Sequence, residues 1–258
     1  MKIQLRQICL VARQLEPVIE DLTDVLGINQ CYVDPGVGQF GLENALMPVG
    51  RNFLEVVAPI QEGTAAGRYL DRRGGNGGYM VITQADSRET QQRVRQNALD
   101  NGVRVAHESQ RGDWNLCQLH PGDLKAAFFE IESDAHNDFD GYWHPVGGLG
   151  WEGEVKQDVT FNFKGLELQC DDPLELGELW AKVAGLDLQH RGNHFAMELN
   201  NAKVRFVEAT DGRGPGLSGI DSAVANRERL LSRADRKGAV VSEDQVDICG
   251  VHWYLHDI

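Results

Sequence analysis

Hydrophobic residues recur along the first part of the chain with strand and helix periods. An apolar stretch at residues 3–12 is typical of a strand, and Gly27 follows the next periodic segment as a C-cap. That segment places apolar residues at the i, i+3, i+4, i+7 spacing of an amphipathic helix, namely at Leu15, Val18, Ile19, Leu22, Val25 and Leu26. Strand-like segments then follow at residues 30–33, 39–46 and 52–58. The pattern predicts a β-α-β-β-β block.

The same pattern repeats three more times, which indicates an internally repeated architecture. The predicted opening strands lie at residues 78–83, 166–170 and 216–223. The predicted helices that follow them lie at residues 87–101, 173–184 and 226–237, each with a glycine directly after it. The predicted closing strands lie at residues 128–132, 203–208 and 246–255. The sequence therefore predicts an α+β fold built from four tandem βαβββ modules.

One segment interrupts the repeats. Residues 136–159 are rich in Gly, His, Trp and Asp and contain several turn-forming residues. We therefore expect a first domain at residues 1–135, a linker at 136–159 and a second domain at 160–258.

The composition narrows the range of partners. The formal net charge of −14 argues against nucleic acid or an anionic membrane, because such partners require clustered Lys and Arg. No apolar run approaches the roughly 20 residues that span a bilayer. The five cysteines are dispersed and lack a CxxC spacing, which favours free thiols. We expect a soluble, cytoplasmic protein that binds a small molecule and could form a homodimer.

Two glutamates in equivalent places of the first two blocks suggest a functional site. Glu55 and Glu130 each lie within an apolar, strand-like run that closes its block. Burying a carboxylate is costly unless a cation or hydrogen bonds compensate for the lost water. The pair therefore suggests a metal or substrate site. The alternative is a pair of buried carboxylates that hydrogen-bond to Arg or Ser/Thr side chains.

Four βαβββ blocks resemble the vicinal oxygen chelate superfamily of glyoxalases, epimerases, extradiol dioxygenases and antibiotic-resistance binders. The first half is most similar to the epimerase-like and glyoxalase-like branch. The resemblance rests on Glu55 with Ala58-Pro59, on Gly77-Gly78-Tyr79, and on Leu119-His120-Pro121-Gly122-Asp123 leading to Glu130. It implies that the modules pair into two curved-sheet cups.

The resemblance also implies a ligand set for a divalent metal such as Zn, Ni, Co, Mn or Fe. The matching positions for metal ligands are Gln7, Glu55 and Glu130. Tyr79 stands where the family normally has His, so we expect it to line the pocket with Met80 and Phe128. The second half shows no such ligand set, which indicates a degenerate cup.

The implied reaction is that of a metal-dependent lyase, isomerase or epimerase acting on a substrate with two neighbouring oxygens. Glu130 or Glu55 would remove a proton to form an enediolate or enolate. Glu132 is an alternative base, although a solvated carboxylate at a strand end is the simpler expectation. A metal-free protein that binds an aromatic or antibiotic-like molecule is the second hypothesis. A dioxygenase is a distant third, because its iron typically needs two histidines.

Overall fold

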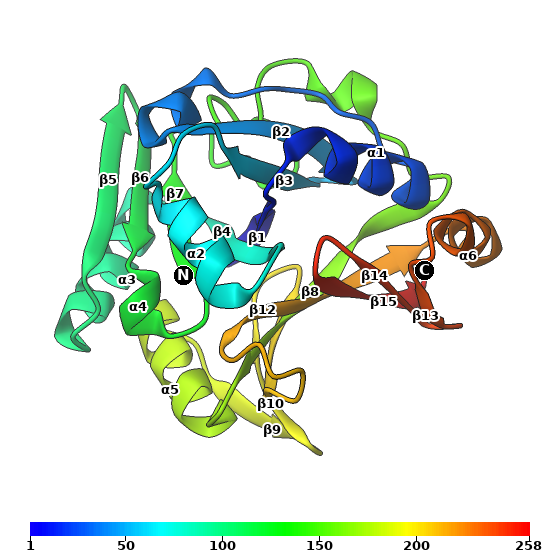
Figure 1. The fold of residues 1–258 in the computed structure, drawn as a ribbon. Helices are drawn as coiled ribbons and strands as arrows, with labels where there is room; N and C mark the ends of the chain where they lie inside the picture. The colour runs from blue at the N-terminus through cyan, green and yellow to red at the C-terminus, as the bar shows by residue number, and fades with distance from the viewer. The chain divides into compact units, whose positions relative to one another are not determined.

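The computed structural model describes residues 1–258 as an α+β protein with a seven-stranded and an eight-stranded sheet (Figure 1). The first sheet contains β1 (Ile3–Val11), β2 (Leu42–Val49), β3 (Asn52–Pro59), β4 (Gly77–Ala85), β5 (Val105–Arg111), β6 (Trp114–Leu119) and β7 (Phe128–Ser133). The second contains β8 (Thr160–Cys170), β9 (Leu188–Arg191), β10 (His194–Glu198), β11 (Lys203–Glu208), β12 (Gly216–Val224), β13 (Val240–Ser242), β14 (Gln245–Ile248) and β15 (Val251–Asp257). The predicted α+β class is confirmed.

The helices follow the predicted pattern. They are α1 (Leu15–Leu26), α2 (Ala65–Arg73), α3 (Arg88–Asp100), α4 (Pro121–Leu124), α5 (Pro173–Ala184) and α6 (Arg227–Arg236), with the 3-10 turns η1 (Pro35–Phe40) and η2 (Trp151–Glu154). Each of the four modules opens with a strand and a long helix, as the sequence predicts. No helix is long and apolar enough to cross a membrane.

The first module differs from the prediction at residues 30–33. Instead of a strand, this segment forms one isolated bridge between Tyr32 and Leu46. The cause is local, because the Asp34 side chain accepts a hydrogen bond from the Gly36 backbone N–H at 2.8 Å and caps η1. A proline at the first position of η1 then fixes the turn, and the backbone leaves the strand conformation.

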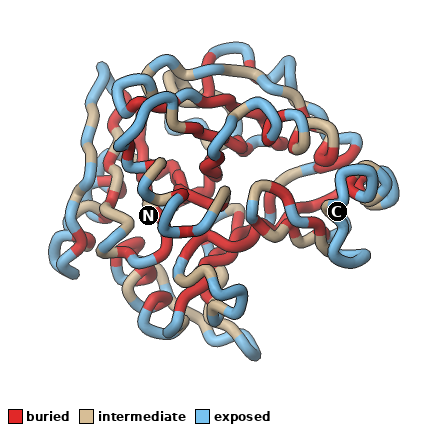
Figure 2. Tube along the Cα trace, in the orientation of Figure 1, coloured by how far each residue is buried: buried red, intermediate tan, exposed pale blue.

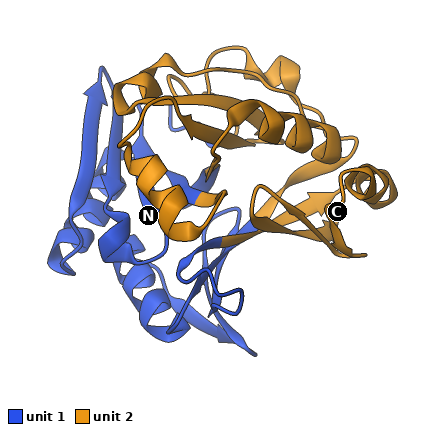
Figure 3. Cartoon of the chain, in the orientation of Figure 1, with its two compact units in different colours: residues 1–7, 79–139, 165–217 blue, residues 8–78, 140–164, 218–258 orange.

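The chain divides into two compact units, shown in blue and orange in Figure 3. Unit 1 comprises residues 1–7, 79–139 and 165–217, and unit 2 comprises residues 8–78, 140–164 and 218–258. Each unit takes segments from both predicted halves, and the division at residues 136–159 stays a prediction. Within unit 1 the strand orders are β4-β7-β6-β5 and β8-β11-β10-β9. Within unit 2 they are β2-β3-β1 and β13-β14-β15-β12-β8.

The core of unit 1 lies between helices and strands. Helix α3 packs on β5, β6 and β7, α5 packs on β9, β10 and β11, and the two helices contact each other. Trp180 of α5 is completely buried, with its ring centroid 5.3 Å from that of Phe129 and 6.3 Å from that of Phe206. Its indole N–H donates to the carbonyl of Leu124 at 3.1 Å. Figure 2 shows the buried segments in red. Trp180 thus joins α5, β7 and β11.

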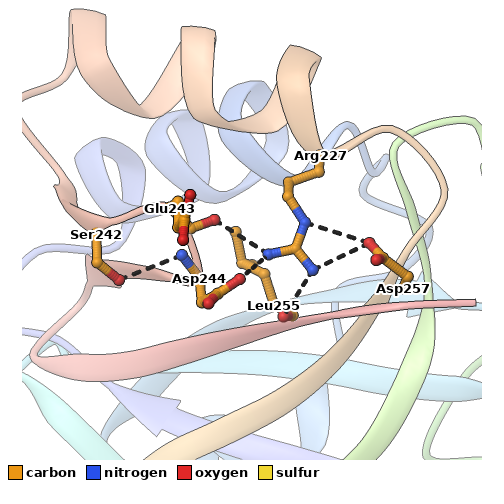
Figure 4. Close-up of polar contacts among 6 residues, drawn as sticks. All are labelled: Arg227, Ser242, Glu243, Asp244, Leu255 and Asp257. Atoms are coloured by element: carbon orange, nitrogen blue, oxygen red, sulfur yellow. Dashed lines mark hydrogen bonds and ion pairs between the residues drawn. The ribbon is translucent and has the colours of Figure 1, made fainter.

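In unit 2, α1 contacts α6, and one arginine ties the start of α6 to the last strand. The Arg227 Nε and Nη2 atoms donate to one oxygen of Asp257 at 3.2 and 3.0 Å (Figure 4). Nη1 donates to Asp244 and to the carbonyl of Glu243, and Nη2 also donates to the carbonyl of Leu255 at 3.1 Å. The guanidinium therefore holds three separate segments of unit 2 together.

Candidate functional site

Strand β7 separates apolar from acidic side chains onto its two faces. Side chains alternate along a strand, so Phe129 and Ile131 share one face while Glu130 and Glu132 share the other. The ring contact between Phe129 and Trp180 identifies the first face as the one that α5 covers. Glu130 lies opposite Gln118 of β6 and Ile82 of β4 in the strand register. Two acidic side chains are thus presented side by side.

Glu130 is held by its neighbours rather than exposed to water, since only 2% of it is accessible. The Gln118 side-chain amide donates to its Oε2 atom at 2.6 Å. The Thr83 hydroxyl donates to its backbone carbonyl at 2.8 Å. These bonds fix the carboxylate and the strand that carries it. The arrangement resembles the second layer of hydrogen bonds that orients reactive or metal-binding carboxylates.

Glu132 is completely buried, so the expectation of a solvated strand-end carboxylate is wrong. The Trp114 indole N–H of β6 donates to its Oε2 atom at 2.7 Å. Burial raises the pKa of Glu132 well above its ordinary value of 4.5, and the charge of Glu130 and a hydrogen bond with it act in the same direction. The bond from Trp114 opposes this pKa shift because it favours the ionised form. Glu132 therefore holds its proton more tightly than an ordinary glutamate does.

A buried arginine extends this polar layer of unit 1. Arg6 of β1 is fully buried, and its Nη1 atom donates to the Gln84 side-chain oxygen and the Asp138 carbonyl, both at 3.2 Å, and to the carbonyl of Phe139. Gln84 lies opposite Glu132 in the register of β4 and β7. The sequence reasoning missed Arg6. Its signal is a lone charged residue inside the apolar strand of residues 3–11.

The three predicted substrate-binding residues lie near one another in unit 1. The rings of Tyr79 and Phe128 meet edge to face with centroids 5.1 Å apart. Met80 is the register partner of Phe128, so by alternation its side chain shares the face of Glu130. Gln7 is buried in β1. Their roles in binding a substrate or a metal stay predictions.

Glu55 lies on β3 of unit 2 and is held in a similar way to Glu130. It is 7% exposed, and the Asn44 side-chain amide of β2 donates to its Oε1 atom at 2.6 Å. Asn44 in turn accepts a hydrogen bond from the Asp34 backbone N–H at 3.0 Å. The sequence led us to weigh Arg or Ser/Thr partners for both glutamates. In each case a carboxamide from the neighbouring antiparallel strand supplies one bond.

The donor chemistry of the predicted ligand set fits a divalent cation. Gln7, Glu55 and Glu130 offer amide and carboxylate oxygens, which suit divalent metals from Mn to Zn. No group of three or more His, Cys, Asp or Glu side chains is gathered so that it could hold a metal ion. That Gln7, Glu55 and Glu130 act together as metal ligands stays a prediction.

The second half contains polar pairs that the sequence reasoning did not identify. On β15, His256 Nε2 lies 3.1 Å from an oxygen of Asp221 on β12, and His252 Nδ1 lies 2.8 Å from an oxygen of Asp247 on β14. Both histidines fall on the same face of β15 by alternation. The placement of both histidines on one strand face can be predicted from the alternating sequence His252-Trp253-Tyr254-Leu255-His256. Their acidic partners cannot be predicted in this way, because they come from other strands.

Comparison with known proteins establishes the family and the fold. The sequence profile of a glyoxalase-like domain matches residues 8–183. A hypothetical protein from Staphylococcus aureus aligns over 100% of both chains at a TM-score of 0.67 and 12% identity. A mutant of 4-hydroxymandelate synthase from Streptomyces coelicolor aligns with 90% of this chain and 75% of its own at a TM-score of 0.64 and 12% identity.

Methylmalonyl-CoA epimerase from Streptomyces coelicolor aligns with 51% of this chain and 97% of its own, at 20% identity and a TM-score of 0.44. At such identities the structural likeness concerns the fold alone. No curated protein matches the sequence. The family profile covers well over half of the chain, and it agrees with the repeated strand-helix modules. The chain therefore belongs to the glyoxalase-like domain family, within the vicinal oxygen chelate superfamily.

Proposed function

We propose that the protein is an enzyme of the lyase or isomerase type that moves a proton in a small oxygenated substrate with two neighbouring oxygens. The observation that carries this proposal is the pair of buried carboxyls, Glu130 and Glu132, on one face of β7. Proton transfer to and from carbon needs a group that takes a proton and a group that returns one. Two carboxyls on one strand face supply both.

Glu130 is the proposed base. Its carboxylate is buried, and the Gln118 amide fixes its orientation. Glu132 lies next to it on the strand and is the carboxylic acid that can return a proton. Met80 and Phe128, which share the face of Glu130, would contact the apolar part of the substrate, and Tyr79 would support Phe128 through their ring contact. This set supports an epimerisation or isomerisation through an enolate or enediolate.

A divalent cation is part of the proposal through the family resemblance. Gln7, Glu55 and Glu130 would hold it, and it would polarise the substrate oxygens and stabilise negative charge on them. The membership of all three residues rests on the resemblance; Glu55 belongs to unit 2, and Gln7 and Glu130 belong to unit 1. The identity of the metal is open among Zn, Ni, Co, Mn and Fe.

The second candidate function is metal-free binding of a small aromatic molecule. The edge-to-face contact of Tyr79 with Phe128 favours it, because aromatic side chains dominate contacts with apolar ligands. In that case Glu130 and Glu132 would be buried structural groups. Only the enzyme would exchange a proton of the bound small molecule with solvent, so this exchange distinguishes the two functions.

Proton exchange with solvent tests the proposal. The protein would be incubated in D2O with a panel of α-hydroxy ketones, 2-acyl thioesters and hemithioacetals, and exchange at the carbon next to the carbonyl would be followed by NMR. We expect exchange that slows about 100-fold or more in Glu130→Gln. Glu198→Gln, at an exposed strand residue of unit 1, is the matched control. Exchange that is absent, or equal in Glu130→Gln, would count against the enzyme.

A further inference from the structure

A polar cavity of about 420 Å³ lies in unit 1, and neither Glu130 nor Glu132 is among its lining residues. It opens between α3 and β5, and its lining consists of charged and carboxamide side chains from Arg88, Gln91, Gln92, Arg95, Gln96 and Glu108. Its size falls within the roughly 300–1,000 Å³ of small-molecule sites. The proposed function leaves this cavity without a role.

The charges in the cavity do not cancel. Arg95 and Glu108 neutralise each other through two hydrogen bonds, at 2.5 Å from Nε and 3.2 Å from Nη2. Arg88 makes no ion pair, and its Nη1 atom donates to the neutral side-chain oxygen of Gln91 at 2.5 Å. The lining therefore carries one more positive than negative side chain, in a chain whose net charge is −14. This local charge favours an anion.

The other donors in the cavity suit the same ligand. Gln92 is exposed on α3 one turn after Arg88, so its amide can turn toward a ligand held by Arg88, whereas the Gln96 amide donates to Asp100 at 2.7 Å. Gln91 is 2% exposed and donates its own amide to the carbonyl of Ile131 at 3.3 Å. This bond connects the cavity lining to β7, between the two acidic residues.

A cavity of about 380 Å³ in unit 2 gives a useful contrast. Its lining also contains two arginines, Arg13 and Arg68, but it includes Glu62 and Asp71 as well. Arg13 forms an ion pair with Asp71 at 3.0 Å, and the charges balance. The unit 1 cavity is therefore the better candidate for an anion site.

We propose that the cavity between α3 and β5 binds a small anion through the Arg88 guanidinium, with carboxamide support from α3. A planar guanidinium fork binds carboxylate and phosphate oxygens in pairs, so the ligand class is a small carboxylate or phosphate. The bound anion replaces Gln91 as the main partner of Arg88. The Gln91 amide, which contacts β7, then reports the occupancy of the cavity.

Calorimetric titration with inorganic phosphate and, separately, with malonate tests the site and distinguishes the two anions. We expect saturable binding of at least one anion, weakened about tenfold or more in Arg88→Gln. Arg88→Lys keeps the positive charge but loses the planar guanidinium. The affinity of this variant for the anion should lie between those of the unmodified protein and of Arg88→Gln. Arg93→Gln is the matched control, because Arg93 lies on the same helix outside the cavity and pairs with Glu89.

A second readout does not depend on a variant. In NMR spectra of the unmodified protein, the Gln91 side-chain amide should shift on addition of the anion that binds. Absence of binding by both anions would overturn the proposal. Equal binding in Arg88→Gln, or an equal loss in Arg93→Gln, would do the same, because the anion would then be held by diffuse surface charge.

Discussion

Glu130 and Glu132 lie two residues apart on one face of β7, and the proximity of their carboxyls makes them unequal. Gln118 donates to Glu130 and Trp114 donates to Glu132, so each has a different partner on β6. Burial and the neighbouring charge keep the proton on Glu132. The environments of the two glutamates thus differ, and the raised pKa of Glu132 lets it hold its proton to a higher pH than an ordinary glutamate.

The stability of the metal-free protein should reveal the proton on Glu132. Because the folded-state pKa is raised, this group contributes its full stability below its ordinary pKa of 4.5 and loses it as the pH rises toward the folded value. Gln at this position has no proton to lose. Glu132→Gln should therefore gain stability relative to the unmodified protein as the pH rises above 4.5 toward the folded-state pKa of Glu132.

Urea unfolding at several pH values, in the presence of a chelator, measures the difference in unfolding free energy between Glu132→Gln and the unmodified protein. Glu198→Gln, at an exposed residue of β10, is the matched control. If the difference in unfolding free energy between Glu132→Gln and the unmodified protein stays constant across the pH range, Glu132 ionises normally.

Trp114→Phe should destabilise the protein by about 1–3 kcal/mol, because it removes the N–H that satisfies a buried oxygen of Glu132. In a Glu132→Leu background the same change should cost far less, since no carboxyl oxygen remains to be satisfied. Chemical unfolding of the unmodified protein, the two single variants and the double variant gives the coupling energy. Equal losses in both backgrounds would assign the effect of Trp114 to its packing.

Arg227→Gln should destabilise unit 2 by about 1–3 kcal/mol, because the guanidinium links the start of α6 to Asp257 and to the Leu255 carbonyl. Arg229→Gln is the matched control, since Arg229 forms one exposed ion pair with Asp158 and should cost less than about 1 kcal/mol. Thermal unfolding compares the two variants. Similar losses of stability in the two variants would show that the hydrogen bonds of Arg227 contribute little to the stability of unit 2.

The sequence predicted those parts of the fold that depend on short-range patterns. The apolar spacing over residues 15–26 and the left-handed Gly27 with φ 68° define α1 with its observed ends. Residues 30–33 failed to form a strand because the turn at Asp34 competes locally with the sheet. Glu55 and Glu130 were found because an acid in an apolar run is unusual. Their Asn44 and Gln118 partners were not found, since only the strand register brings them together.

The divalent-metal content of protein purified without chelator tests metal-dependent proton transfer most directly. Elemental analysis would compare the unmodified protein with Glu55→Gln, Glu130→Gln and the Glu198→Gln control. We predict about one ion per chain in the unmodified protein and the control, and a large loss in the two other variants. An unmodified protein without metal, or full metal content in Glu130→Gln, would contradict the account.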